Sequence, residues 1–442
     1  MDTEKLKQKI LDLAIRGKLV PQDSNDESAE ELIKKIQEEK AKLVKEGKIK
    51  ASKEESIIFK GSDNCYYEKT TKRIIKVDEN FEFPKSWISM KLGSIGDWGA
   101  GATPNRSNKS YYENGDVLWV KTGELNDGYI FDSIEKITTK ALNECSLRNN
   151  NVGDVLIAMY GATIGKLGIA AVPLTTNQAC CACTPFSFIN NEYLFYYLMA
   201  IKPLLISKSY GGAQPNISKE KITNCFINFP KLDEQILIVN KIKELFKKIE
   251  TIGNEYNSII NLISATKRKV LEEIFGENSS YKSYYENKIP ITDDVEILDY
   301  LRKPINTSER LERLSNATNT YPYYGATGQT GLIDDYLIDG EYVLLGEDGA
   351  PFLDKNSLKA YLINGKSWVN NHVHILKSKT NNKFLMYYLN WFNYYDYVTG
   401  TTRLKLNQGM LKKILIPNIP AEIKGRIVSQ IENAFYILES II

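Results

Sequence analysis

The chain has 442 residues, of which 43% are hydrophobic and 25% are charged, and this length allows two or three domains that each bury a core of their own. The formal net charge is only +2, which excludes a protein that holds nucleic acid through overall charge alone, so any DNA contact must be local or shared with partners. No apolar run reaches the length of a membrane span, and Met1–Lys5 is too charged to open a secretory signal, so we expect a cytoplasmic protein without membrane contact.

Residues 1–80 are expected to hold two helices and a linker. The phrase Lys9-Ile10-Leu11-Asp12 is similar to Lys269-Val270-Leu271-Glu272, which lies in a later helical segment, so a helix is predicted near the N-terminus. A second helix, from Ala29 to Glu46, is predicted from apolar residues on a Lys- and Glu-rich surface: Leu32, Ile33, Ile36, Leu43 and Val44. This helix either leans on the core or docks a partner, and the pattern leaves both open. The polar segment Lys48–Lys76 is interpreted as a linker.

Residues 81–231 form the first predicted globular unit. Short β-type runs such as Asp116–Val120 and Val155–Met159 alternate with turns, and an aromatic helix is expected around Glu192–Leu198. The chain has six cysteines, no CxxC pair and only two histidines, so structural zinc is not expected. The cysteine cluster in an apolar run of this unit is interpreted as core filling with reduced thiols: Cys180, Cys181 and Cys183.

Residues 232–277 are predicted to contain a long coiled-coil helix. The stretch Leu232–Phe275 has no proline, and its apolar or small residues are spaced alternately three and four apart, which is typical of a coiled-coil seam. The seam positions are Val239, Ile242, Phe246, Ile249, Gly253, Tyr256, Ile260, Ile263, Lys267, Val270 and Ile274. At about 1.5 Å per residue, the seam spans roughly 50 Å.

The rest of the chain repeats the first part. Residues 278–420 form a second predicted unit, with strands at Tyr342–Leu345 and Val369–Leu376 and a second aromatic helix. His372 and His374 alternate on one of these strands, where a structural or DNA-facing role is favoured over catalysis. Residues 421–442 repeat the start of the long helix through Val428, Ile431, Phe435, Leu438 and Ile442.

This repeat is too long for a solenoid unit and indicates a duplicated domain. The expected fold class is therefore α+β, with two similar globular domains joined by long antiparallel coiled-coil helices and related by pseudo-two-fold symmetry. The two terminal helices, laid end to end, would form a second rod antiparallel to the long helix.

The sequence lacks the motifs of enzymes that act on DNA or nucleotides. The segment Gly161–Lys166 is one residue too short between its glycines for a phosphate loop, and Leu167 stands where a Ser or Thr would bind Mg²⁺, so a β-turn that exposes Lys166 is favoured. No Asp-Pro-Pro-Tyr or Asn-Pro-Pro-Tyr segment, which would grip an adenine amino group, is present. We therefore expect no catalytic and no metal-binding residue in this chain.

The loops that are not repeated are rich in side chains that bind bases and phosphates. Arginine side chains commonly form hydrogen bonds with guanine, and Asn and Gln side chains with adenine. Tyr and Thr side chains commonly contact the DNA backbone. The candidate DNA contacts are Thr103, Asn105, Arg106, Asn108, Lys109, Lys121, Lys166 and Gln214 in the first unit, and Tyr323, Tyr324, Gln329, Lys366, Asn371 and Arg403 in the second. Arg106 and Arg403 are the leading candidates because each lies in a Gly-, Thr- or Asn-rich loop without an apolar neighbour that would call for burial.

Several motifs in order carry a resemblance to a known family. Gly99-Ala100-Gly101-Ala102-Thr103-Pro104, the segment Gly161–Lys166 and Asn177-Gln178 resemble a target recognition domain of the specificity subunit of type I restriction-modification enzymes. In the second unit, Tyr321–Ala326, Gly346–Ala350 and Gly365–His372 resemble the other common version of that domain, although this unit lacks a clear Gly-x-Thr-Pro opening. Ile15–Gln22 and Ala41–Lys50 also fit, so the resemblance covers nearly the whole chain.

The resemblance implies a non-catalytic subunit that recognises a bipartite, asymmetric site in double-stranded DNA, with one domain on each half-site and the helices as a ruler that binds two modification subunits. Those partners would methylate adenine with S-adenosylmethionine, and restriction or translocase subunits would add ATP- and Mg²⁺-dependent cleavage, while this chain would hold no cofactor. A stand-alone two-headed DNA-binding regulator and a self-contained methyltransferase or nuclease stay open as alternatives. The bases recognised and the spacer length do not follow from the sequence.

Overall fold

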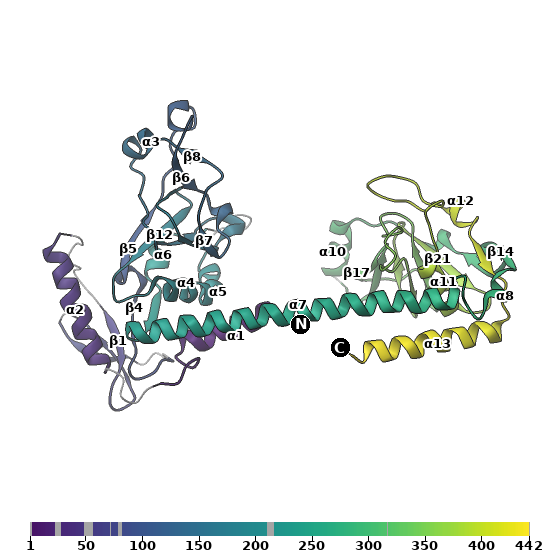
Figure 1. Cartoon of the computed structure of the whole chain (residues 1–442), viewed down its shortest axis with the longest axis horizontal. Coiled ribbons are helices and arrows are strands. Elements are labelled where there is room, and N and C mark those ends of the chain that lie inside the picture. Colours follow the sequence, from purple (N-terminus) through teal and green to yellow (C-terminus); the bar gives the residue numbers. More distant parts are fainter. Residues whose placement is uncertain are drawn as a thin grey trace. The chain divides into compact units, whose positions relative to one another are not determined.

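The computed structural model describes residues 2–22, 28–47, 56–70, 72–77, 82–209, 216–315 and 317–441. The chain divides into two compact units, Met1–Asn254 and Glu255–Ile442 (Figure 1). The boundary falls within helix α7 (Leu232–Phe275), whose bounds are those predicted from the seam. None of the helices in the described ranges combines the length and the apolar character that crossing a bilayer requires.

The described part of the first unit is built on three sheets. Its helices, besides the start of α7, are α1 (Thr3–Ile15), α2 (Ala29–Lys45), α3 (Thr139–Glu144), α4 (Asn191–Ala200), α5 (Lys202–Ser207) and α6 (Lys219–Thr223). An antiparallel sheet has the order β13-β4-β1-β2-β3, from β1 (Ile57–Lys60), β2 (Tyr66–Lys69), β3 (Ile74–Val77), β4 (Ile88–Lys91) and β13 (Phe226–Phe229). The second sheet has the order β5-β12-β9-β10-β7, from β5 (Gly96–Ala100), β7 (Gly128–Ile130), β9 (Val155–Ala158), β10 (Leu167–Ala170) and β12 (Cys180–Pro185). A small sheet has the order β11-β6-β8, from β6 (Val117–Val120), β8 (Lys136–Ile137) and β11 (Thr175–Thr176).

The interpretation of Lys48–Lys76 as a linker is wrong for the described part of that segment. Strands β1 and β2 and most of β3 lie within it, and Ile57 and Ile58 are buried under α2 and β4. Each strand has only four residues, too few to show a clear alternation of polar and apolar residues. The strand that completes the pairing, β4, also lies beyond the segment in sequence, so local composition gave no sign of it. Residues 48–55 and 71 lie outside the described residues.

The second unit contains the end of α7 and six further helices in its described residues: α8 (Lys282–Tyr285), α9 (Ile291–Asp294), α10 (Thr307–Ser315), α11 (Asn382–Trp391), α12 (Gln408–Leu411) and α13 (Ala421–Glu439). Its main sheet has the order β15-β21-β18-β19, from β15 (Val295–Ile297), β18 (Tyr342–Gly346), β19 (Ala360–Ile363) and β21 (Val373–Ser378). A small sheet has the order β17-β16-β20, from β16 (Tyr321–Gly325), β17 (Gly328–Ile333) and β20 (Trp368–Val369), and β14 (Lys288–Pro290) pairs with β22 (Leu415–Pro417).

The two units share one framework, which confirms the repeat and the α+β fold class. The order β5-β12-β9-β10 matches β15-β21-β18-β19, and in both small sheets the middle strand pairs in parallel with a two-residue strand, β11 or β20. The aromatic helices α4 and α11 both begin with an asparagine cap, Asn190 or Asn381. Each cap side chain accepts a 2.9 Å hydrogen bond from the backbone N–H three residues later.

In the first unit, α1 runs antiparallel to the start of α7. Lys7 Nζ of α1 lies 5.9 Å from the centre of the Phe246 ring, and a Cβ built on Gly253 would lie 3.3 Å from Cγ2 of Thr3. The Phe246 ring also meets the ring of Tyr196 on α4 edge to face, with centroids 5.9 Å apart. The N-terminal helix therefore packs on the seam that the spacing of apolar residues predicts.

The second unit repeats this packing with α13 beside the end of α7. Phe435 of α13 meets Tyr387 of α11 at a centroid distance of 5.6 Å, and Lys267 Nζ of α7 lies 5.0 Å from the Phe435 ring. Lys267 also binds Glu439 at 2.5 Å. The end of α7 thus has the same role in this unit that α1 has in the first, as the similarity of their sequences predicts.

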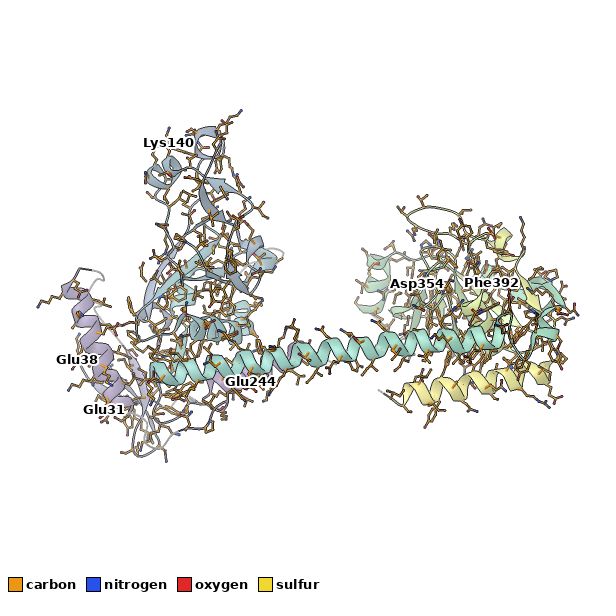
Figure 2. The ribbon with its side chains drawn as sticks, in the orientation of Figure 1. Glu31, Glu38, Lys140, Glu244, Asp354 and Phe392 are labelled. Atoms are coloured by element: carbon orange, nitrogen blue, oxygen red, sulfur yellow. The ribbon has the colours of Figure 1, made fainter. Side chains whose placement is uncertain are left out.

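The outer face of α7 carries ion pairs one helical turn apart. Glu244 binds Lys241 at 2.9 Å and Lys248 at 2.5 Å (Figure 2). The hydrogen bonds from Lys248 and Lys241 lower the pKa of Glu244 to about 2. Pairs at this spacing support a helix whose outer side faces water.

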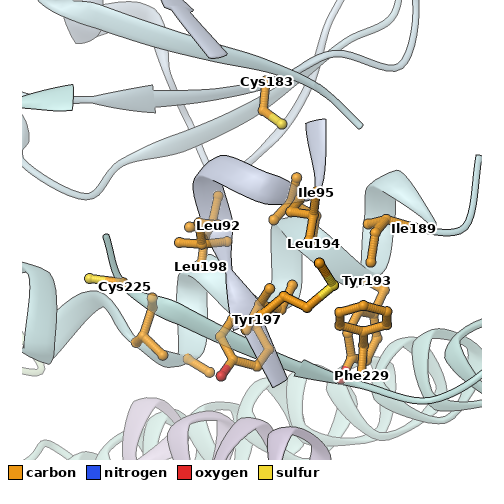
Figure 3. Close-up of a cluster of buried hydrophobic side chains, with 14 of the residues drawn as sticks. Leu92, Ile95, Cys183, Ile189, Tyr193, Leu194, Tyr197, Leu198, Cys225 and Phe229 are labelled. Atoms are coloured by element: carbon orange, nitrogen blue, oxygen red, sulfur yellow. The ribbon is translucent and has the colours of Figure 1, made fainter. Parts of the chain in front are cut away.

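Each aromatic helix lies in the core of its unit, and the core of the first unit also contains the cysteine cluster. Figure 3 shows the cluster in the first unit where Cys183 lies over Leu92, Ile95 and the side chains of α4. The interpretation of the cysteine cluster as core filling is confirmed, because Cys180, Cys181 and Cys183 are all buried in β12. Burial raises the pKa of the Cys181 thiol to about 11.

Candidate nucleic-acid interface

In the first unit, two motifs that are far apart in sequence meet at the start of the candidate loop. Gly101 packs directly on Thr176, since a Cβ at Gly101 would lie 2.1 Å from the Thr176 carbonyl oxygen. The Ala102 N–H donates to the same carbonyl at 3.1 Å, and the exposed Thr103 hydroxyl donates to Oε1 of Gln178. The glycine-rich opening and the Gln178 segment therefore form one structure.

Arg106 packs against two aromatic rings and is paired with a carboxylate. Its guanidinium carbon is 4.7 Å from the centre of the Tyr112 ring and 4.8 Å from the centre of the Trp119 ring, and it forms a bidentate bond with Glu135. Lys121 Nζ binds the same carboxylate at 2.5 Å. The hydrogen bond from Arg106 lowers the pKa of Glu135, and the bond to Glu135 raises the pKa of Arg106.

The expectation that Arg106 has no apolar neighbour is therefore wrong. Its guanidinium packs against the rings of Tyr112 and Trp119, which meet edge to face with centroids 6.2 Å apart. The composition of the loop did not indicate this contact, because Trp119 lies on β6. The side chain is still 52% exposed, so a ligand can reach it. The structure thus presents Arg106 in a fixed orientation, with Glu135 as its partner.

Three candidates of the same loop form its turns or face solvent. Oδ1 of Asn105 accepts from the Ser107 N–H at 3.1 Å, and Oδ1 of Asn108 accepts from the Ser110 N–H at 3.2 Å. Each asparagine therefore stabilises a local turn with its carbonyl group. Lys109 is exposed, and its Nζ lies 3.9 Å from Glu113.

Lys166 lies where a turn joins β9 to β10. Its N–H donates to the Thr163 carbonyl at 2.9 Å, and Gly161 and Gly165 have φ of 64° and 74°. The segment leads into strand β10 and not into a helix, which agrees with the predicted turn. The Lys166 side chain is only half-buried, and Gln214 lies outside the described residues.

The candidates of the second unit surround its small sheet, but not all of them are accessible. Tyr323 is only 7% exposed, and the guanidinium of Arg310 lies 5.2 Å from its ring, so its side chain packs inward where the prediction expected an accessible one. On a short strand the sequence did not show which face packs inward. Tyr324, the next residue, is half-buried and packs against Tyr361 with centroids 5.8 Å apart.

Three other candidates of this unit are exposed. Gln329 donates from Nε2 to the Gly331 carbonyl at 3.3 Å, and Lys366 Nζ lies 4.7 Å from the centre of the Tyr336 ring. Asn371 lies two residues after the end of β20 and is open to solvent. These three side chains lie at or near the ends of β16, β17 and β20, where a ligand can reach them.

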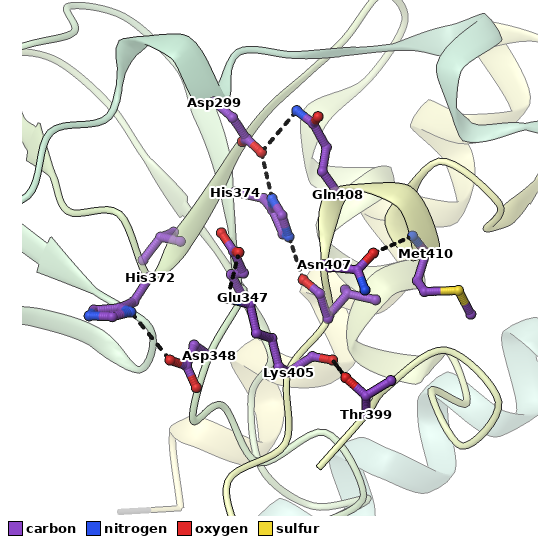
Figure 4. A network of polar contacts seen from close by, with 12 residues as sticks. Asp299, Glu347, Asp348, His372, His374, Thr399, Lys405, Asn407, Gln408 and Met410 are labelled. Carbon is purple, nitrogen blue, oxygen red and sulfur yellow. Dashed lines mark hydrogen bonds and ion pairs between the residues drawn. The ribbon is translucent and has the colours of Figure 1, made fainter.

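Arg403 lies in the loop Thr399–Leu406 and, like Arg106, is paired with a carboxylate. Its Nε is 2.7 Å from Oδ1 of Asp348, and Nδ1 of His372 is 3.5 Å from the other oxygen of that group (Figure 4). Lys405, in the same loop, lies 3.5 Å from Glu347. Each unit therefore presents an exposed arginine that an acidic residue from another segment holds in place.

Sequence reasoning missed these acidic partners. Asp348 lies in Gly346–Ala350, one of the motifs that carry the family resemblance, so it could have been included among the candidates. Nothing in the sequence around Glu135 connects it with Arg106. His374 is completely buried, which favours the structural over the DNA-facing interpretation for this histidine.

Comparisons with a family model and with known proteins all point to one family. The family model for the type I restriction modification DNA specificity domain matches residues 84–261 and 292–441. A protein of Haemophilus influenzae named as a type I restriction enzyme specificity subunit, S.HindORF215P, is 36% identical over 141 residues, which are 31% of this chain and 34% of that protein. The MjaIX specificity subunit of Methanocaldococcus jannaschii is 28% identical over 305 residues, which are 65% of this chain and 66% of that protein.

A chain from a solved structure of the type I R-M system is similar in fold, with a TM-score of 0.60 at 16% sequence identity. The match covers 82% of this chain and 93% of that chain. The chain spans about a third of the length of the Haemophilus relative and just under two thirds of the Methanocaldococcus relative.

Proposed function

Because this chain belongs to the family defined by the type I restriction modification DNA specificity domain, we propose that it is the DNA-recognition subunit of a type I restriction-modification enzyme. Each of its two units contacts one half of a bipartite, asymmetric site in double-stranded DNA. The observation that carries this proposal is the combination of one shared framework with two different sets of exposed loops. A shared framework suggests a common task, and different loops suggest different base sequences.

The paired arginines suit direct recognition of bases. A guanidinium that is held in one plane can donate two parallel hydrogen bonds to O6 and N7 of guanine in the major groove. Arg106 packs against both Tyr112 and Trp119, so less side-chain freedom is lost when it binds. The carboxylates of Glu135 and Asp348 are acceptors that suit the N4 amino group of cytosine, so each pair offers a donor and an acceptor to adjacent bases.

Helix α7 is the proposed ruler between the half-sites. Its 44 residues form one continuous helix. At 1.5 Å per residue it is about 66 Å long. Half-sites one DNA turn apart are about 34 Å from centre to centre, so a helix of this length is sufficient to set their separation.

The chemistry is assigned to partner subunits. Two modification subunits would bring S-adenosylmethionine and methylate adenine, and restriction or translocase subunits would use ATP and Mg²⁺, while this chain contributes no catalytic group. The two alternatives are a stand-alone two-headed DNA-binding regulator and a self-contained methyltransferase.

Co-expression with the modification subunit of the same source, in a host without adenine methylation at other asymmetric sites, tests the proposal. We expect a stable complex and methylated adenines in one bipartite motif, which sequencing of the host DNA would identify. Specific DNA binding by the chain without any methyltransferase partner would favour the regulator. Binding of S-adenosylmethionine to the isolated chain would favour the enzyme.

A further inference from the structure

His374, on β21, is completely buried, and both of its ring nitrogens face hydrogen-bond acceptors. Nδ1 lies 2.7 Å from Oδ2 of Asp299, and Nε2 lies 2.8 Å from the carbonyl oxygen of Leu406 (Figure 4). A neutral imidazole has one N–H and can donate to only one of these oxygens. Both hydrogen bonds form together when both ring nitrogens carry a proton.

The proton is not supplied by Asp299. Its Oδ1 accepts from the Ile375 N–H at 3.1 Å, and its Oδ2 accepts from Nε2 of Gln408 at 3.3 Å, so both oxygens act as acceptors. Burial alone would raise the pKa of Asp299, but the hydrogen bond and charge of His374, together with Arg302 at 3.7 Å, outweigh burial and lower it. An ionised Asp299 accepts from the ring and cannot donate to it.

The carbonyl group of Leu406 lies at the end of the loop Thr399–Leu406, which carries Arg403. The Leu406 N–H donates to the Glu347 carbonyl at 2.8 Å, and the Gly349 N–H donates to the Leu404 carbonyl at 3.0 Å. The base of the loop is therefore fixed on one side by the backbone after β18 and on the other side by His374. Its two cations, Arg403 and Lys405, are exposed on this base.

The first unit has no such histidine at the corresponding place. His374 pairs with Leu345 of β18, and Cys181 pairs with Ile157 of the equivalent strand β9. Leu345 and Ile157 both belong to the core on the helix side of their sheet, and Cys181 is fully buried there. The shared framework therefore folds with a small apolar side chain here, so a charged histidine at this position serves something particular to the second unit.

We propose that His374, as an imidazolium, is a positioning residue for DNA recognition by the second unit. It ties the loop Thr399–Leu406 to Asp299 and thereby sets the direction in which Arg403 and Lys405 meet their half-site. The charged groups that face this region are Asp299 and Arg302 after β15, Glu347 after β18, and Lys405 in the loop. The role in DNA recognition rests on the proposed function, whereas the doubly protonated ring does not.

The protonation is tested on the free chain, without DNA. The chain has only two histidines, so the full-length protein labelled with ¹⁵N-histidine gives two imidazole spin systems, and a His372→Gln variant assigns them. We expect two ring N–H protons for His374 at neutral pH, with slow exchange because the ring is buried. A single N–H would overturn the inference, whatever the chain does with DNA.

The positioning role is tested on the complex with the modification subunits by a double-mutant cycle. His374→Gln keeps a polar side chain that can reach only one of the two acceptors, and Asp299→Asn removes the negative charge with little change in shape. We expect each to weaken binding to the methylated motif about 10-fold, the size expected for loss of one charge-assisted hydrogen bond. In a background with both Arg403→Ala and Lys405→Ala the further loss should nearly vanish, because His374 acts through these two cations of the loop.

Effects that add fully to those of the combined Arg403→Ala and Lys405→Ala replacements, or unchanged binding by both variants, would overturn the positioning role. Weaker discrimination in the half-site of the first unit would also contradict it. If the wild-type complex recognises no specific site, the proposed function fails, and the NMR result still decides the protonation of His374.

Discussion

Arg106 packs against two aromatic rings that also contact each other, and it is paired with Glu135, so its contribution depends on shape as well as on charge. We predict that Arg106→Ala costs about 1–3 kcal/mol of binding free energy and relaxes one base position in the half-site of the first unit. Lys109→Ala is the matched control, because this exposed lysine of the same loop has no aromatic partner among its described contacts. The Lys109→Ala variant should weaken binding of the complex to all DNA sequences to the same extent. Sequencing of methylated adenines distinguishes the two, and an unchanged motif in Arg106→Ala cells would remove Arg106 from the interface.

Lys359 gives a second prediction at the residue scale. It is 2% exposed, its Nζ donates to the Asp354 carbonyl at 2.5 Å, and burial, with the nearby charge of Arg268, lowers its pKa to about 8 from an ordinary value of 10.5. The folded state therefore loses this proton first, so the group costs stability below pH 8 and that cost disappears between about pH 8 and 10.5. Comparing urea unfolding of the wild type and Lys359→Met across this range should show that the advantage of the variant shrinks as pH rises. A difference that does not change with pH would contradict the assignment.

The loops that carry the candidate contacts could be predicted from composition, but the pairing within them could not. Polar loop residues such as Arg403 were found because Gly and Thr neighbours indicate exposure. The contacts of Glu135 and Tyr323 could not be predicted, because their partners come from other segments and only the folded chain brings them together. Pairings of this kind depend on register, which a short strand does not reveal.

At the scale of the element, the two asparagine caps provide a test of the repeat. Asn190→Ala and Asn381→Ala should each reduce the free energy of unfolding by about 1 kcal/mol, since each cap accepts one backbone N–H of an aromatic helix. Asn143→Ala, at an exposed position inside α3, is the control and should change it little. Denaturant unfolding of the full chain measures all three. A large loss at only one of the caps would show that the two frameworks are not energetically equivalent.

Helices were easier to predict than sheets for a physical reason. The bounds of α7 followed from a seam that extends over many turns, so each local preference agreed with the next. The sheet that contains β1, β2 and β3 depends on pairing with β4 and, through β4, with the distant β13. No window of sequence contains that information.

At the scale of the whole molecule, the shared framework predicts modular recognition. Replacing residues 81–231 by the equivalent unit of a relative should change one half of the methylated motif and leave the other half unchanged. The reciprocal replacement of residues 278–420 is the control and should change the opposite half. Changes in both halves after a single replacement would contradict independent recognition.

The length of α7 gives the last prediction. Inserting one heptad between Gly253 and Ile260 keeps the apolar seam in phase and lengthens the helix by about 10 Å. With DNA rising about 3.4 Å per base pair, the unspecified spacer should grow by roughly two or three base pairs while both half-sites stay the same. Sequencing of methylated DNA from cells with the variant complex measures the spacer. An assembled complex that keeps the original spacing would show that the partner subunits set the distance.

The matching caps and the matching Phe–Tyr contacts of the two units also bear on how such proteins diversify in evolution. Both units use the same caps and the same Phe–Tyr contacts where they join the long helices. An exchange of one unit by recombination therefore keeps these contacts unchanged. With several variants of each unit that share these contacts, the number of different two-unit chains equals the product of the two numbers and not their sum.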